Sequence, residues 1–155
     1  MVRLATKKDI PYIDVLREEL FLLHAAGRPE MFRQEFNTAL REHTNDWLDE
    51  DDRCIYLFEE DGTICGLASV HFTEKEASTY FIPHKFCTIN EIIVDKSCRG
   101  KGVGKALVAQ IREDALAKGF DRLELNMWEF NESALAFYEA IGFKTYRRYM
   151  DMVIT

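Results

Sequence analysis

Three glycines within five residues constrain this chain more than any other feature. They stand in the segment Arg99-Gly-Lys-Gly-Val-Gly104, between a β-rich run and an amphipathic helical run. A strand, a glycine-rich turn and a helix in this order point backbone N–H groups at an anion. The dipole at a helix N-terminus disfavours cations, yet Arg99, Lys101 and Lys105 gather there. We therefore predict that this loop binds a negatively charged group.

Two other phosphate-binding patterns do not fit the segment. A P-loop with its lysine at Lys105 requires glycine at position 99 and a hydroxyl at 106, where the chain has Arg99 and Ala106. The dinucleotide pattern Gly-x-Gly-x-x-Gly/Ala, started at Gly100 or Gly102, ends on a residue that is neither glycine nor alanine. We exclude both patterns.

Length and composition indicate one globular domain that spans residues 1–155. No apolar run approaches the roughly 20 residues that cross a bilayer, and the N-terminus lacks a secretory apolar core. We therefore expect a cytoplasmic protein with no membrane partner. The formal net charge of −7 disfavours nucleic acid and suits a cationic amine. The four cysteines lack metal-site spacing, which predicts free thiols and no metal.

The order of the predicted elements indicates the fold class. A short strand over 2–5 precedes a helix whose apolar stripe runs from Ile10 to Leu23, and we expect a second helix over 30–42. A hairpin with an Asp-Gly turn joins strands at 54–58 and 63–72. The remaining elements are expected as a strand over 86–94, a helix over 103–115, a strand over 123–127, a helix over 131–141 and strand-rich sequence over 143–154. This order predicts an α/β fold, a mixed and mostly antiparallel sheet with helices on both faces.

The glycine loop resembles the Arg/Gln-x-x-Gly-x-Gly/Ala signature of the GNAT superfamily of acetyl-CoA-dependent N-acetyltransferases. The predicted element order is similar to that family over nearly the whole chain. The resemblance implies that acetyl-CoA is the cofactor and that two central parallel strands splay apart beside it. It implies that the pyrophosphate binds the loop and that the pantetheine arm runs along the preceding strand. The cofactor-binding residues expected from it are Ile92, Ile93, Val94, Arg99, Gly100, Lys101, Gly102, Val103, Gly104 and Lys105.

A second segment, from Asn131 to Phe143, resembles the recurring family pattern Asn-x-x-(Ala)-x-x-x-Tyr-x-x-x-Gly-Phe. Asn131 suits the N-cap of a helix, and the resemblance adds a contact with the pantetheine amide. Tyr138 suits a core aromatic position, and the resemblance adds the role of general acid that protonates the thiolate of coenzyme A. The resemblance also assigns the oxyanion contact to the backbone N–H of Val94.

The residue that accepts the proton of the amine is less clearly marked. Glu91 lies three residues before Val94, among isoleucines, and is the leading candidate; a solvated position or a loop-orienting role is the alternative. His71 and His84 are further candidates. Cys98 adjoins the loop but has no evident activating base, so direct transfer in a ternary complex is expected.

The resemblance implies that the acceptor binds mostly at two regions, 24–36 and 74–85. His24, Arg28, Tyr80 and Phe81 are the candidate acceptor-binding residues, although His24 and Arg28 also suit a turn between helices. A small-molecule amine is the expected acceptor. The alternatives are a peptide or protein N-terminus, or binding of an acyl-CoA without catalysis. Exposed strand edges near the C-terminus would allow a homodimer.

Overall fold

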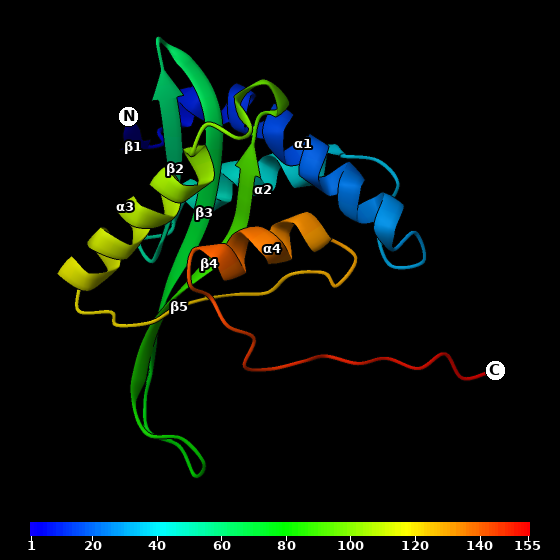
Figure 1. The fold of residues 1–155 in the computed structure, drawn as a ribbon, viewed down its shortest axis with the longest axis vertical. Coiled ribbons are helices and arrows are strands. Elements are labelled where there is room, and N and C mark those ends of the chain that lie inside the picture. Colours follow the sequence, from blue (N-terminus) through cyan, green and yellow to red (C-terminus); the bar gives the residue numbers. More distant parts are fainter.

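A five-stranded sheet with four helices forms the fold (Figure 1), which we describe for residues 1–155 of a computed structural model. The strands follow the order β1-β2-β3-β4-β5, antiparallel except for the parallel pair β4–β5. The strands are β1 (Val2–Leu4), β2 (Arg53–Glu60), β3 (Thr63–Lys75), β4 (His84–Val94) and β5 (Leu123–Leu125), and the helices are α1 (Ile10–Gly27), α2 (Thr38–Asp49), α3 (Val103–Ala117) and α4 (Glu132–Ala140).

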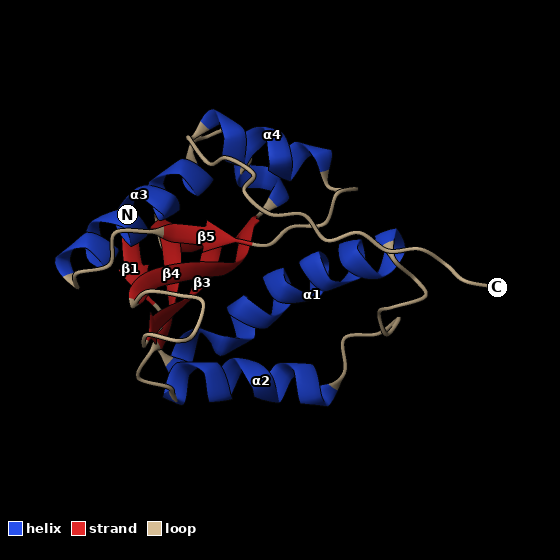
Figure 2. Ribbon diagram, turned by 90° about the horizontal axis from the view of Figure 1, so that it is seen from below, coloured by secondary structure: helices blue, strands red, loops and turns tan.

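The sheet separates two helical layers (Figure 2). Helices α1 and α2 cover one face, and α3 and α4 cover the other. The larger core of 14 buried residues lies under α3, whereas the core under α1 has only six. Helix α3 buries one stripe of side chains against the sheet, Val103, Leu107, Val108, Ile111 and Ala115. The predicted mixed sheet with helices on both faces is confirmed.

The hairpin β2–β3 turns at Asp61-Gly62, and both residues have positive φ, 49° and 77°. A two-residue loop with positive φ at both positions matches the twist of the flanking strands, which explains the Asp-Gly pair. Strands β3 and β4 then form a longer hairpin whose tip lies far from the helices (Figure 1).

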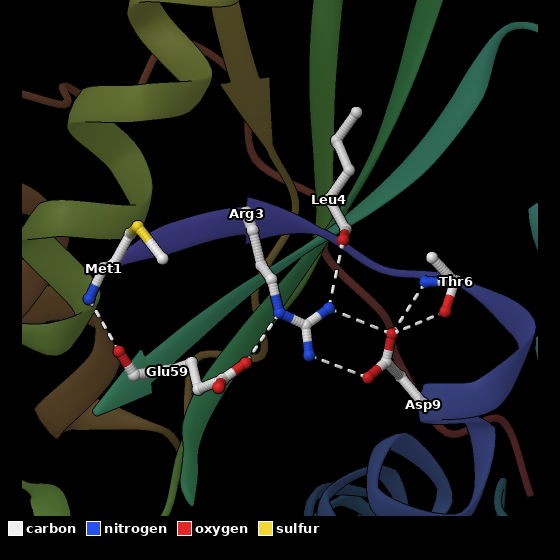
Figure 3. A network of polar contacts seen from close by, with 6 residues as sticks. All are labelled: Met1, Arg3, Leu4, Thr6, Asp9 and Glu59. Atoms are coloured by element: carbon white, nitrogen blue, oxygen red, sulfur yellow. Dashed lines mark hydrogen bonds and ion pairs between the residues drawn. The ribbon is translucent and has the colours of Figure 1, made fainter. Parts of the chain in front are cut away.

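An ion-paired network ties the start of the chain to the sheet (Figure 3). Arg3 donates to Glu59 at 2.7 Å and to both oxygens of Asp9, at 2.8 and 3.0 Å. Asp9 also accepts from the backbone N–H of Thr6 at 2.8 Å. These bonds hold the pKa of Asp9 well below its usual range. The network therefore stabilises the connection between β1 and α1.

Two predicted elements are wrong. The second helix spans Thr38–Asp49 and not residues 30–42, because Asn37 accepts from the N–H of Leu40 at 3.2 Å and caps the helix there. Phe32 and Phe36, whose spacing fits a helix, pack edge-on against Phe21 in the segment before this cap. The strand-rich reading of 143–154 also fails, because those residues pair with no strand of the chain.

The other predicted elements are confirmed with small shifts of their ends. All four cysteines are free, three of them buried. None of the helices combines the length and the apolar character that a membrane crossing requires.

Candidate functional site

The glycine loop joins the end of β4 to the start of α3. Gly100 and Gly102 have φ of 75° and 82°, and a Cβ at either residue would meet no atom within 4 Å. Glycine is therefore required at these two positions by backbone conformation and not by crowding. Gly104 differs, since a Cβ there would lie 3.0 Å from the ring of Phe137, and its small size lets α4 pack against α3.

The N-terminus of α3 presents free hydrogen-bond donors. The backbone N–H groups of residues 99–105 donate no hydrogen bond to another protein atom, and Gly102 supplies no capping side chain. The first intrahelical bond is made by the N–H of Ala106 to the carbonyl of Gly102 at 3.0 Å. Several unpaired N–H groups at a helix N-terminus form an anion-binding site.

The three cations of the loop are not equivalent. Arg99 donates to the carbonyl of Val94 at 3.1 Å and to Glu19 of α1 at 2.9 Å, so its guanidinium braces the end of β4. Lys101 and Lys105 are exposed and form no ion pair. These two lysines remain available to an anion at the helix terminus.

Strand β4 has an unpaired edge next to this loop. Its pairing with β5 covers only Cys87 to Ile89, and β4 continues for five residues to Val94 without a partner on that side. Ile92 and Val94 turn their side chains toward the α3 core, and Ile93 toward the α1 core. The edge beside these three residues can pair with an extended ligand as a further strand would.

Helix α4 places Tyr138 on the α3 side of the sheet. The ring is buried beside Phe137 and Phe143, with centroids at 5.2 and 5.7 Å. Burial raises the pKa of Tyr138 to about 12, so the phenol keeps its proton at neutral pH. The hydroxyl makes no hydrogen bond within the protein but is not sealed from solvent, and it is free to donate.

Asn131 caps α4, as its position in the sequence predicts. Its side-chain oxygen accepts from the N–H of Ala134 at 3.3 Å and from the hydroxyl of Ser133 at 3.2 Å. The cap fixes where α4 begins and so helps to position Tyr138.

A β-bulge at Asn90 decides which way Glu91 faces. Ser69 of β3 pairs with Glu91 and Val70 pairs with Ile89, which leaves Asn90 as the extra residue on β4. Before the bulge, odd-numbered residues such as Ile89 face α3; after it, Glu91 and Ile93 face α1. Bulges near sites re-aim side chains in this way.

Glu91 therefore meets polar neighbours, not the apolar surroundings that its sequence suggests. Arg17 of α1 donates to its two oxygens at 3.0 and 3.3 Å, and the Ser69 hydroxyl lies 3.4 Å away. Arg17 also donates to Thr44 of α2 at 2.7 Å, and Thr44 donates to the buried Asp14 at 2.6 Å. The network borders a pocket of about 230 Å³ lined by Arg17, His43, Thr44, Trp47, Ile55, Ser69, Asn90 and Glu91.

Sequence reasoning missed Arg17. It lies four residues after Ile13 and three before Leu20, on the apolar stripe of α1. A cation at such a position needs a buried partner. The position of Arg17 on the apolar stripe of α1 therefore indicates a carboxylate on the sheet that faces this helix.

His24 and Arg28 lie at the far end of α1, within an aromatic cluster. His24 is half-buried, with its ring 5.7 Å from that of Phe32 and 6.4 Å from that of Phe130. Desolvation lowers the pKa of His24 below the ordinary histidine value, and the charge of Glu91 partly offsets this. Arg28 lies over the ring of Trp128, 5.5 Å from its centroid, and pairs with Asp151 at 2.8 Å.

The other candidates lie away from this end of the molecule. Tyr80 and Phe81 are exposed at the tip of the β3–β4 hairpin, separated from the glycine loop by the length of β4. His84 begins β4 and stacks on Phe86. His71 contacts Asp52 at 2.9 Å. The ring of His71 lies 6.5 Å from that of Trp47, which lines the pocket at Glu91, whereas Tyr80, Phe81 and His84 do not line that pocket.

Cys98 lies just before the loop but is buried. A hydrogen bond with Cys98, together with burial, raises the pKa of the neighbouring Cys65 to about 11. The pair belongs to the α3 core.

A sequence model of a protein family and a known protein both match this chain. The sequence model of the acetyltransferase (GNAT) family matches residues 18–143. A glucosamine 6-phosphate N-acetyltransferase of Trypanosoma brucei brucei is 39% identical over 99 residues, and the match covers 63% of each protein. The chain thus spans less than two thirds of that relative.

Solved structures share the fold over the whole chain. A mutant of the BH1408 protein from Bacillus halodurans superposes with a TM-score of 0.95 at 22% identity, covering 100% of this chain and 99% of the other. The aminoglycoside N-acetyltransferase AAC(6')-Iy in complex with CoA superposes with a TM-score of 0.78 at 18% identity, covering 99% and 93%.

Proposed function

Because this chain belongs to the acetyltransferase (GNAT) family, we propose that it transfers the acetyl group of acetyl-CoA to a primary amine of a small molecule. Both substrates are bound together, and the amine attacks the thioester directly. The reaction releases coenzyme A and an N-acetylated product.

One observation carries the proposal: the free N–H groups of α3 directly follow the unpaired edge of β4. A pyrophosphate at residues 100–105 receives these N–H groups and the charges of Lys101 and Lys105. The pantetheine arm then runs along Ile92, Ile93 and Val94, and Asn131 contacts its amide. This placement matches what a ligand with an anionic end and an extended, amide-containing arm requires.

The chemical step needs one acid and one base. The amine nitrogen forms a bond to the thioester carbon, and the carbon–sulfur bond breaks after the amine has lost a proton. The backbone N–H of Val94 stabilises the negative charge on the carbonyl oxygen. Tyr138 gives its proton to the departing thiolate. The raised pKa of Tyr138 supports this role, because the phenol is fully protonated when the thiolate forms.

We assign the base role to Glu91, on the face of the sheet opposite Tyr138. Its ion pair with Arg17 holds the carboxylate at the wall of the pocket, where it can accept a proton directly or through water. His24 is the competing residue, since its lowered pKa leaves the imidazole neutral near pH 7. Glu91→Gln and His24→Gln variants separate the two assignments: the variant of the true base loses the low-pH limb of kcat/KM, and the other retains it.

The acceptor is proposed as a small amine because the relatives named above act on glucosamine 6-phosphate and aminoglycosides by name. A screen of amines with detection of released thiol tests the function. Release of coenzyme A thiol from acetyl-CoA in the presence of a sugar amine, an amino acid or a polyamine supports the proposed function. Release only with peptide N-termini would favour the peptide alternative. No release with any amine, despite a thermal shift with CoA, would favour an acyl-CoA-binding protein without catalysis.

A further inference from the structure

Asp14 is a buried carboxylate to which the proposed reaction gives no direct role. It lies in the second turn of α1 and is 6% exposed. It forms no ion pair, and its one hydrogen bond comes from the hydroxyl of Thr44 on α2, at 2.6 Å. A buried carboxylate needs a cation or several hydrogen bonds to offset its desolvation. Asp14 has neither in direct contact, so the compensating charge must act from beyond Thr44.

Thr44 connects Asp14 to a cation, and the chemistry of its two partners fixes the direction of both bonds. A threonine hydroxyl has one proton, and a guanidinium can only donate. The oxygen of Thr44 therefore accepts from Nη1 of Arg17, at 2.7 Å, and its proton goes to Asp14. Thr44 is fully buried, so no water competes for either bond.

Arg17 serves two carboxylates through different nitrogens of one guanidinium. Nε donates to Glu91 at 3.0 and 3.3 Å, and Nη1 donates to Thr44 and, at 3.4 Å, to the carbonyl of Leu40. The side chain of Arg17 is 11% exposed, so solvent screens these charges only weakly. Along the chain of bonds from Asp14 to Glu91, the formal charges are two negative and one positive.

Three histidines lie near Glu91 on elements packed against the α1 side of the sheet. His24 of α1 is close enough for the charge of Glu91 to act on it, and His43 of α2 lines the pocket. The ring of His71 of β3 lies 6.5 Å from the indole in the pocket wall. A histidine can add only positive charge, so none of these groups can replace the negative charge of Asp14.

We propose that Asp14 is a positioning residue that acts on Glu91 through Thr44 and Arg17. It holds the guanidinium by way of the Thr44 hydroxyl and takes a share of its positive charge, so Arg17 orients Glu91 without neutralising it in full. A second negative charge disfavours the ionised form of a carboxylate, so Asp14 makes Glu91 a better proton acceptor. This inference rests on the proposed role of Glu91 as the base.

The titration of Glu91 in the protein without substrates tests the electrostatic effect. Carbon-13 NMR of labelled glutamate carboxyls follows it, and Glu91→Gln identifies the signal by its loss. Asp14→Asn removes the charge and keeps the shape, and should move the midpoint of the Glu91 titration to lower pH by about one unit. Asp49→Asn, at an exposed aspartate of α2, is the matched control and should move it far less. An unchanged midpoint in Asp14→Asn would overturn the proposal.

Two changes at Thr44 test the connection between Asp14 and Arg17. Thr44→Ser keeps the hydroxyl and should retain the wild-type midpoint. Thr44→Val keeps the shape but loses both hydrogen bonds, and a buried carboxylate without a hydrogen bond favours its neutral form. The midpoint should therefore fall as it does in Asp14→Asn, with the helical circular dichroism of the wild type. Equal midpoints in the serine and valine variants would show that the hydroxyl does not carry the effect, and would overturn the proposal.

The low-pH limb of kcat/KM for the amine separates this proposal from the proposed function. With Glu91 as the base, the limb should be lost in Glu91→Gln and should move to lower pH in Asp14→Asn. A limb that is lost in Glu91→Gln but does not move in Asp14→Asn would overturn the positioning role alone. A limb that survives Glu91→Gln would overturn the base assignment, and the NMR titration would still decide whether Asp14 acts on Glu91.

Discussion

The two faces of the sheet are built differently. The face under α3 and α4 is apolar, with a core of 14 buried residues, and it carries the glycine loop and Tyr138. The face under α1 and α2 has a core of six buried residues and a chain of polar contacts from Glu91 to Asp14. We call the face under α3 and α4 the donor face, because the proposed cofactor site lies there and depends largely on backbone groups. We call the face under α1 and α2 the acceptor face, because its polar side chains are the ones that we propose select the acceptor.

The largest expected effect lies on the donor face. Tyr138→Phe removes the proton that the thiolate receives and leaves the packing of the ring. We expect kcat to fall by about 100-fold or more, with little change in KM for acetyl-CoA. Tyr12→Phe, at an exposed tyrosine of α1, is the matched control. An unchanged kcat under conditions where chemistry limits the rate would remove the general-acid assignment.

On the acceptor face, we expect the largest loss of stability when the ion pair between Arg17 and Glu91 is removed. Arg17→Met leaves the half-buried carboxylate without its cation and should lower the free energy of unfolding by about 2–3 kcal/mol. Arg41→Met breaks the exposed pair with Glu18 and should cost less than about 1 kcal/mol. Urea unfolding measures both, and equal losses would show that the acceptor face tolerates an unpaired charge.

The local sequence determines the donor site well. Gly100, Gly102 and the apolar stripe of α3 are neighbours in the chain, so their arrangement follows from turn and helix geometry alone. The orientation of Glu91 depends on a bulge at Asn90, and the bulge depends on how β3 and β4 pair. Its partner Arg17 is 74 residues away in the sequence. No local pattern contains that information.

The predictions for residues 30–42 and 143–154 failed for related reasons. The spacing of Phe32 and Phe36 fits a helix, but tertiary contacts with Phe21 and the cap at Asn37 hold the segment as a loop. The composition of residues 143–154 fits a strand, but a strand also requires an edge to pair with, and residue propensity does not say whether one is in reach.

The pH dependence of unfolding gives a third test of the difference between the two faces. On the α1 side, Asp9 joins the start of the helix to Arg3 of β1. Its depressed pKa means that the stabilisation is complete above the ordinary aspartate pKa, about 3.9, and is lost as the pH falls toward the value in the folded protein. Asp9→Asn should lower stability at pH 7 by about 1.5 kcal/mol and reduce the loss between pH 7 and pH 3. Parallel pH profiles of the variant and the wild type would contradict this.

The smallest effect is expected where α3 meets α4. Gly104→Ala places a Cβ against the ring of Phe137 and should cost about 1 kcal/mol. Adding Phe137→Leu shortens the opposing side chain and should return part of that loss in a thermal unfolding experiment. If the double variant were less stable than the sum of the two single effects, crowding would not be the cause.

The bulge at Asn90 makes β4 two half-strands of opposite phase. Its first half gives its odd-numbered side chains to the donor face, and its second half gives them to the acceptor face. The strand thus presents Glu91 on the α1 face and Ile92 and Val94 on the α3 face, directly after the bulge. Deleting Asn90 would remove the bulge but leave Glu91 opposite Ser69 and facing α1, whereas a strand that kept Asn90 in regular alternation would turn Glu91 beneath α3.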